Sequence, residues 1–272
     1  MEGLPETENL ILELSQGWLS IWFNRPDNRN ALSEGLAGDL AAVLEAVRGD
    51  RSVRGITLRG KGGIFCSGAD LKAFNANSIN NDRQLILASS LKAGALFALI
   101  NSMPQVTVII VEGAAMAGGL GMVCCGDVVI ATPDAKFALT ETMIGLSPAQ
   151  ISPFVIQKFG YATARRLMLT AARFEGKEAA ELGLVDFLCD DDLGLCTAEN
   201  RVKAQVLQCA PGAIAATKAL LVALPTLGPD ELQAYAANNF ADCLMAEEGR
   251  EGVASFAEKR RPSWSQRLDE KS

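Results

Sequence analysis

The fold is decided by residues 106–126, which read VTVIIVEGAAMAGGLGMVCCG. The β-branched run Val106–Val111 is typical of a strand buried inside a sheet. Small residues follow it, and no side chain from Leu120 to Gly126 carries a charge, so we expect a short buried helix there. A buried strand that runs directly into a helix is a building unit of α/β proteins.

The flanking sequence alternates strand and helix signals in the same way. A helix is predicted from Ser33 to about Val47, because apolar residues recur three and four positions apart from Leu36 onward and Ser33 suits an N-cap. A second apolar helix is predicted at 85–100. Strands are predicted at 10–14, 18–23, 53–59, 128–131 and 137–139. This alternation predicts an α/β fold.

The strand signal ends at about Gly194. Helical segments follow at 195–209, 211–223, 229–242 and 249–260, and no low-complexity linker precedes them. We therefore divide the chain into a core at 1–193 and a helical region at 194–272. An appended helical region of this kind acts as a lid or an oligomerisation element, and we expect it to pack closely on the core.

The composition excludes several kinds of active site, because none of the 272 residues is histidine. Hydrolases with a Ser-His-Asp or Cys-His site, zinc sites with histidine ligands and facial-triad iron sites all need imidazole. We therefore predict no metal site, and acid–base chemistry must use other side chains. The net charge of −7, from 25 Lys+Arg and 32 Asp+Glu, also argues against a nucleic-acid or anionic-membrane partner.

The cysteines and the N-terminal residues indicate a cytoplasmic protein. The chain has seven cysteines, an odd number, without a Cys-x-x-Cys pair, and it starts MEGLPETENL, which lacks the features of a secretory signal. We interpret the thiols as reduced, and Cys124 and Cys125 as buried apolar residues. No uninterrupted apolar stretch of about 20 residues occurs, so we expect no membrane span.

Two glycine-rich segments follow predicted strands. Residues 62–72 read GGIFCSGADLK and residues 112–122 read EGAAMAGGLGM. Small residues let a ligand approach backbone N–H groups, and the N–H groups at a helix start favour negative charge. Each segment taken alone also fits a purely structural role, as a strand-to-helix turn or as a close contact between a helix and a strand. Neither matches a nucleotide-binding fingerprint.

A third segment, FALTETMIG at 137–145, places Glu141 among mainly apolar neighbours. Burial disfavours the charged form of a carboxyl group and raises its pKa, which suits proton transfer near neutral pH. The alternative interpretation is a solvated turn residue.

Taken together and in this order, these segments resemble the crotonase (enoyl-CoA hydratase/isomerase) superfamily over nearly the whole chain. The motifs that carry the resemblance are NRPDNRNALS at 24–33, FCSGADLKAF at 65–74, VEGAAMAGGLGMVCCGDVVIA at 111–131, KFALTETMIGLSPAQ at 136–150, TARRLMLTAARFEGKEAAELGLVD at 163–186 and FAEKRRPSW at 256–264. Within the superfamily, LSPAQISPF, TAARFEGKEA and KRRPSW are most similar to hydratases of branched glutaconyl-CoA substrates, isohexenylglutaconyl-CoA first and methylglutaconyl-CoA next.

The resemblance implies a spiral of ββα units with C-terminal helices that assemble a trimer or a pair of trimers. It implies an acyl-CoA thioester as substrate, without a separate cofactor, whose carbonyl oxygen binds the backbone N–H groups of Ala69 and Gly118. It also assigns residues to the CoA moiety. Ser67, Asp70 and Leu71 belong to the loop that holds the adenine, Arg29 meets a phosphate, and Phe256 and Lys259 reach the CoA of a neighbouring subunit.

One departure from the family pattern concerns the catalytic carboxylates. Hydratases of the family commonly carry two glutamates, and this chain retains the second as Glu141 but has Gly121 in place of the first. Three functions remain open: a hydratase of branched glutaconyl-type acyl-CoA, a Δ3,Δ2-enoyl-CoA isomerase in which Glu141 shuttles a proton, and a non-catalytic acyl-CoA binder. For a hydratase with one glutamate, placing Glu at position 121 should raise hydration of plain crotonyl-CoA.

Few residues in the sequence indicate where the acyl group binds. The helix at 85–100 and Phe74 are expected to line the acyl pocket. Gln150, which stands where a glycine is common in hydratases, is the candidate for contact with a substrate carboxylate.

Overall fold

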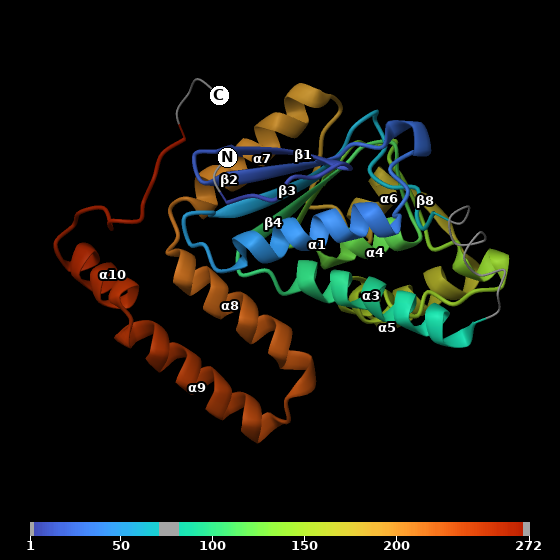
Figure 1. Cartoon of the computed structure of the whole chain (residues 1–272). Helices are drawn as coiled ribbons and strands as arrows, with labels where there is room; N and C mark the ends of the chain where they lie inside the picture. The colour runs from blue at the N-terminus through green and yellow to red at the C-terminus, as the bar shows by residue number, and fades with distance from the viewer. Residues whose placement is uncertain (1–2, 71–81, 269–272) are drawn as a thin grey trace.

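The computed structural model describes residues 3–70 and 82–268 of the chain. Its main sheet has six strands in the order β1-β2-β3-β4-β6-β9, of which only the β1–β2 pair is antiparallel (Figure 1). These strands are β1 (Leu10–Ser15), β2 (Trp18–Phe23), β3 (Gly55–Gly60), β4 (Val106–Val111), β6 (Val128–Ala131) and β9 (Phe187–Leu188). A smaller sheet has the order β5-β7-β8, formed by β5 (Ala114–Met116), β7 (Lys136–Ala138) and β8 (Arg173–Glu175). The predicted α/β class is confirmed.

The helices cover both faces of the main sheet and continue into a C-terminal extension (Figure 1). They are α1 (Glu34–Arg48), α3 (Arg83–Asn101), α4 (Gly118–Cys125), α5 (Ser152–Thr170), α6 (Gly176–Glu181), α7 (Asp192–Val206), α8 (Pro211–Ala223), α9 (Pro229–Met245) and α10 (Glu247–Ala257). Short 3-10 helices are η1 (Pro26–Asn28), η2 (Glu141–Ile144) and η3 (Leu224–Thr226). The predicted N-cap is confirmed, since Ser33 Oγ accepts a hydrogen bond from Leu36 N–H at 3.2 Å.

Strand β4 shows why the sheet is buried on both faces. Side chains alternate between the two faces of a strand. Ile109 and Val111 belong to the main core with α1, α3 and α4, whereas Val108 and Ile110 pack against α7 on the opposite face. The β-branched run therefore forms a strand whose alternate side chains pack into two hydrophobic cores, one on each face of the sheet.

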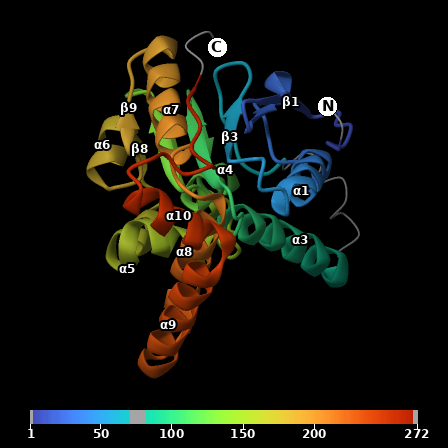
Figure 2. The same cartoon turned by 90° about the vertical axis from the view of Figure 1, so that its left-hand side faces the viewer.

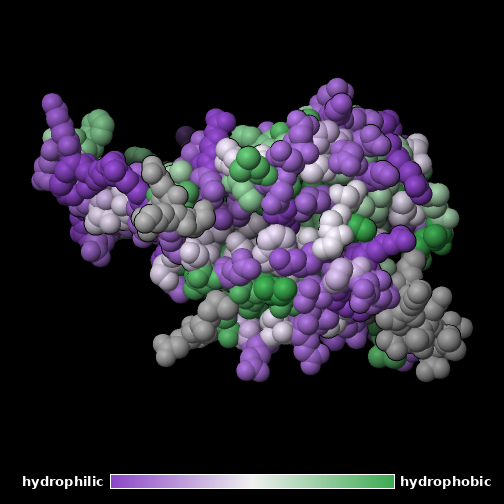
Figure 3. All heavy atoms as spheres, turned by 90° about the horizontal axis from the view of Figure 1, so that it is seen from above, coloured by the Kyte–Doolittle hydropathy of each residue, from purple (hydrophilic) through white to green (hydrophobic). Residues whose placement is uncertain are grey.

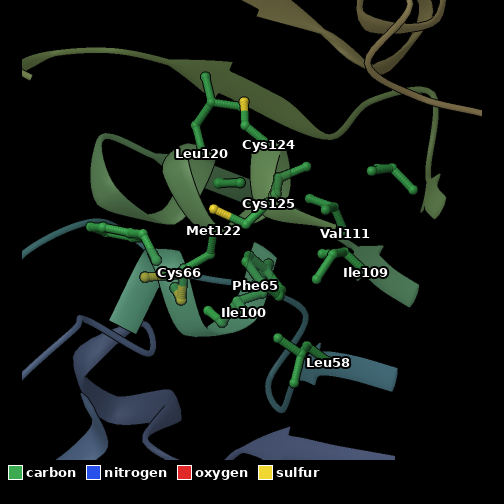
Figure 4. Close-up of a cluster of buried hydrophobic side chains, with 14 of the residues drawn as sticks. Leu58, Phe65, Cys66, Ile100, Ile109, Val111, Leu120, Met122, Cys124 and Cys125 are labelled. Atoms are coloured by element: carbon green, nitrogen blue, oxygen red, sulfur yellow. The ribbon is translucent and has the colours of Figure 1, made fainter. Parts of the chain in front are cut away.

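Helix α4 is enclosed by the main core. Every one of its residues after Gly118 is buried, and Met122 lies beside Phe65 and Ile100 (Figure 4). Burial raises the pKa of the Cys124 thiol to about 12, because the thiolate would lose its hydration. The interpretation of Cys124 and Cys125 as buried apolar residues is confirmed, and the seven cysteines are all free thiols.

Helix α7 packs on the sheet, so the part of the chain that leaves the core is α8–α10 (Figure 2). Helix α8 is held to the core by Lys218, whose Nζ donates to Asp127 Oδ2 at 2.6 Å and to the Gln105 carbonyl at 3.1 Å. Burial lowers the pKa of this ammonium group, and the Asp127 carboxylate opposes that shift. The division of the chain at residue 193 stays a prediction.

Helix α3 has the length and mean hydropathy of a membrane span, and only 22% of its most apolar 18-residue stretch is buried. Buried helices of water-soluble domains meet the same criterion. Leu96, Phe97 and Ile100, in the C-terminal half of α3, pack into the main core. We therefore treat α3 as a helix of the α/β core.

We predict that Asp127→Ala lowers the free energy of unfolding by about 3 kcal/mol, because it leaves the buried Lys218 ammonium without its carboxylate. Urea unfolding at fixed protein concentration measures the change. Asp134→Ala, at an exposed aspartate, is the control and should change stability by less than about 0.5 kcal/mol. Equal effects of the two substitutions would show that Lys218 does not anchor α8.

Candidate active site

Two backbone segments from different parts of the chain pair beside α4. Cys66 N–H donates to the Ala114 carbonyl at 3.0 Å, and Met116 N–H donates to the Cys66 carbonyl at 2.9 Å. The loop after β3 thus runs parallel to β5. Gly68 has φ +97, and a Cβ added to it would lie 3.1 Å from the Ala117 Cβ. The two glycine-rich segments therefore touch just before Ala69 and Gly118.

The N–H groups of Ala69 and Gly118 have no hydrogen-bond partner among the residues that the structure describes. Leu32 N–H donates to the Gly68 carbonyl at 2.8 Å and Asp70 N–H donates to the Leu32 carbonyl at 3.1 Å. Ala69 lies between these two bonds in a parallel bridge, so its own N–H points away from Leu32. Gly118 is the first residue of α4, where an N–H has no partner inside the helix.

Ala117 fixes the direction of the helix start. Its φ of 48° and ψ of −120° are unusual for a residue with a side chain, and such a conformation costs about 1–3 kcal/mol. The surrounding contacts hold it in place, since Ala117 N–H donates to the Ala138 carbonyl of β7 at 2.8 Å. This bond also brings Glu141, three residues beyond Ala138, toward the start of α4.

Glu141 begins η2 and is half-buried. Its Oε2 atom is shielded from solvent and has no hydrogen-bond partner within the described residues. Burial raises the pKa of the carboxyl group, and a hydrogen bond from the residue's own backbone opposes the shift. Glu141 thus lies in a turn, as the alternative interpretation has it, but its carboxyl group is not fully solvated. A carboxyl group without a partner and with a raised pKa is suited to exchange protons with a ligand.

The position of the missing glutamate is filled by another side chain. A Cβ added to Gly121 would lie 2.3 Å from Ile151 Cγ2, and Ile151 is itself only 4% exposed. A glutamate at 121 has no room in this arrangement. The expectation that Glu at 121 raises hydration of crotonyl-CoA stays a prediction, and the contact with Ile151 argues against it because Ile151 would have to move.

The structure brings three of the six expected CoA-binding residues, Arg29, Ser67 and Asp70, into one loop cluster. Ser67 N–H donates to the Arg29 carbonyl at 3.1 Å, and the Arg29 side chain is exposed. Arg25, which the sequence analysis missed, lies 3.7 Å from the Asp70 carboxylate and donates to the Ala31 carbonyl at 3.1 Å. Arg25 lies in the same NRPDNRNALS motif as Arg29. Its place in that motif could have identified it as a candidate CoA-binding residue.

The remaining expected contacts lie elsewhere. Phe256 and Lys259 lie at the end of α10, in the helical extension away from α4 (Figure 1), and Phe256 is 87% exposed. A single chain does not bring them to the loop cluster, and their contact with a neighbouring subunit stays a prediction. Leu71 and Phe74 lie outside the described residues.

A comparison with known protein families identifies this arrangement. The model of the family described as enoyl-CoA hydratase/isomerase matches residues 13–267. The chain belongs to the enoyl-CoA hydratase/isomerase family.

Relatives in this family cover almost the whole chain. A protein of Rhodobacter capsulatus with the name "Probable enoyl-CoA hydratase" is 33% identical over 94% of this chain and 97% of its own length. The structure of Pseudomonas aeruginosa AtuE is similar to this structure with a TM-score of 0.91 and 45% sequence identity. The match covers 95% of this chain and 100% of the AtuE chain. An enoyl-CoA hydratase/isomerase structure from Marinobacter aquaeolei has a TM-score of 0.89 at 37% identity, and covers 95% and 99%. The crotonase-like fold is confirmed.

We predict that Glu141→Gln lowers kcat by about 10²–10⁴, the range for a lost general acid–base group. The wild-type activity should fall on the acid side of the pH profile through a pKa above the ordinary carboxyl value, and this limb should vanish in the variant. Steady-state rates with an enoyl-CoA substrate measure both effects. An unchanged acid limb in an active variant would remove Glu141 from the proton transfer.

The same substitution should raise the melting temperature. The pKa of the Glu141 carboxyl group is raised by folding. The folded protein therefore loses stability relative to the unfolded chain as the pH rises through the folded-state pKa. At neutral pH the ionised, buried carboxylate therefore opposes folding, and glutamine removes that cost. A melting temperature below that of the wild type at neutral pH would contradict this.

We predict that Gly121→Glu lowers stability and activity, whereas Gly121→Glu combined with Ile151→Ala recovers at least part of the stability, because the shorter side chain vacates the space. Thermal unfolding of both variants, with Ile151→Ala as the control, checks this. A single variant as stable as the wild type would contradict the steric account.

Proposed function

We propose that the protein is an enoyl-CoA hydratase that adds water across the α,β double bond of a branched, glutaconyl-type acyl-CoA, with isohexenylglutaconyl-CoA as a candidate substrate. The observation that carries this proposal is the contact between the segments that hold Ala69 and Gly118, whose N–H groups have no partner among the described residues. The start of α4 is in turn bonded to β7 just before Glu141, whose Oε2 atom is buried without a partner in the same part of the chain. Membership of the enoyl-CoA hydratase/isomerase family supplies the thioester as the substrate class.

The two N–H groups stabilise the negative charge that develops on the thioester oxygen. Water attacks the β-carbon, the electron pair of the double bond moves toward the carbonyl oxygen, and an enolate forms. Donors that are already oriented need no rearrangement at that moment, and loss of one typically costs about 10²–10³ in rate. Ala69 and Gly118 donate these hydrogen bonds from the backbone. Their side chains contribute only by being small enough to let the thioester approach.

Glu141 completes the reaction by handling protons. The enolate becomes product when its α-carbon takes up a proton, and the β-carbon keeps the hydroxyl group of the water. We assign both proton steps to Glu141: its carboxylate takes the proton that the attacking water loses, and the carboxyl group then gives that proton to the α-carbon. The space where a second glutamate would lie holds Ile151, so a carboxylate carried by the substrate is the group that helps to order the water.

A single carboxylate also favours a second candidate, a Δ3,Δ2-enoyl-CoA isomerase. Glu141 would then take a proton from one carbon and return it to another, with the same N–H groups stabilising the dienolate. This reaction needs no ordered water and so does not depend on a substrate carboxylate. The observation that supports the isomerase is that Ile151 occupies the space beside Gly121 where a second glutamate side chain would lie.

The assembly belongs to the same proposal. The face in Figure 3 is mainly polar, with separate apolar areas. Large apolar side chains on the extension remain exposed in the single chain, among them Phe240, Met245, Val253 and Phe256. We propose that α8–α10 assemble a cytoplasmic homotrimer or a pair of trimers, in which Phe256 and Lys259 meet the CoA held by Arg29, Ser67, Asp70 and Leu71 of a neighbour.

We expect the purified protein to convert a branched glutaconyl-CoA with loss of the conjugated enoyl thioester absorbance and a product mass increased by one water. A panel of acyl-CoA thioesters, including isohexenylglutaconyl-CoA, crotonyl-CoA and a Δ3-enoyl-CoA, tests this by absorbance and product mass. A product of unchanged mass from the Δ3 substrate would favour the isomerase. Binding of every thioester without conversion would contradict both enzymatic functions.

A further inference from the structure

Gln150 reaches across from the loop before α5 to helix α3. Its side-chain Nε2 donates to Ser90 Oγ at 2.9 Å. Gly94, one turn further along α3, leaves room for the amide, since a Cβ at that position would lie 2.1 Å from Gln150 Oε1. A polar pair is thus built between residues 60 positions apart in the chain, and the helix carries a glycine where the amide lies against it.

The pair lies on the face of α3 that also contacts Gly118, the proposed oxyanion donor. Ser90, Gly94 and Phe97 are four and three residues apart, so they share one face of α3. Phe97 Cζ lies 3.7 Å from the position of a Cβ on Gly118. Seven residues of helix, from Phe97 back to Ser90, span about 10 Å. The residue after Gln150 is Ile151, which packs against Gly121 of α4. The loop that carries Gln150 therefore borders both α3 and α4.

The pair offers two free donors to a ligand. Ser90 Oγ accepts from Gln150, so the Ser90 hydroxyl proton and the second N–H of the amide remain available. If the amide is turned over, Oε1 accepts from Ser90 and both amide N–H groups are available. Either orientation leaves two donors, and neither side chain has another hydrogen bond within the described part of the chain. Two adjacent donors match the oxygens of a carboxylate, which only accepts.

We infer that Gln150 and Ser90 determine acyl specificity by binding the distal carboxylate of the acyl chain. This inference rests on the proposed function. In a glutaconyl group, four carbon–carbon bonds of about 1.5 Å separate the thioester carbon from the distal carboxylate carbon. With a hydrogen bond of about 3 Å at each end, this length is similar to the rise of about 10 Å along α3 from Phe97, which contacts Gly118, to Ser90.

Gln150→Met and Ser90→Ala test the inference, because each removes donors while it largely keeps the shape of the side chain. Gln157→Met and Ser89→Ala are matched controls at neighbouring positions outside the pair. The measurement is kcat/KM for two thioesters: 3-methylglutaconyl-CoA, and 3-methylpent-2-enoyl-CoA, which has a methyl group in place of the carboxylate. We expect the preference for the carboxylate substrate to fall about 10-fold or more in the Gln150 and Ser90 variants, and to stay unchanged in the controls.

Gly94→Ala gives a second test that leaves both polar side chains in the protein. Its methyl group pushes the Gln150 amide away, so the same loss of preference is expected. Wild-type conversion of both thioesters with a preference that none of the three variants changes would overturn the inference and leave the proposed function intact. A wild-type protein that converts neither thioester would instead overturn the proposed function.

Discussion

The short parallel pairing between the loop after β3 and strand β5 is the interaction on which the site depends. Two backbone hydrogen bonds, from Cys66 to Ala114 and from Met116 to Cys66, hold together segments that are about 50 residues apart. Without this pairing, the N–H groups of Ala69 and Gly118 would belong to two unrelated turns. Burial of Cys66 and Ala115 protects these bonds from water, so the main core supports the site directly.

Glu141 depends on the same point of contact. The bond from Ala117 N–H to the Ala138 carbonyl joins the start of α4 to β7, and Glu141 follows in the next turn. Its Oε2 atom is buried without a partner in the described part of the chain, which is unfavourable for stability but leaves the group ready for a substrate proton. The strained backbone of Ala117 is a second local cost at the same place. Both costs lie where the proposed chemistry occurs.

Much of the architecture could be predicted from local patterns, whereas side-chain contacts across the chain could not. The run Val106–Val111 and the helix that Ser33 caps were evident, because burial and capping leave periodic and local signals. Strands β5, β8 and β9 were missed, since each has only two or three residues and is defined by its pairing. The burial of the Glu141 carboxyl could be predicted from its apolar neighbours. The contact of Ile151 with Gly121 and that of Gln150 with Ser90 could not, because each joins distant positions.

The most direct test of the account is a structure of the protein with a bound acyl-CoA thioester. The account predicts that the thioester oxygen lies within about 3 Å of the N–H groups of both Ala69 and Gly118, with the Glu141 carboxyl beside the α- and β-carbons. A thioester whose oxygen contacts neither N–H group, or a Glu141 side chain turned away from those carbons, would contradict it.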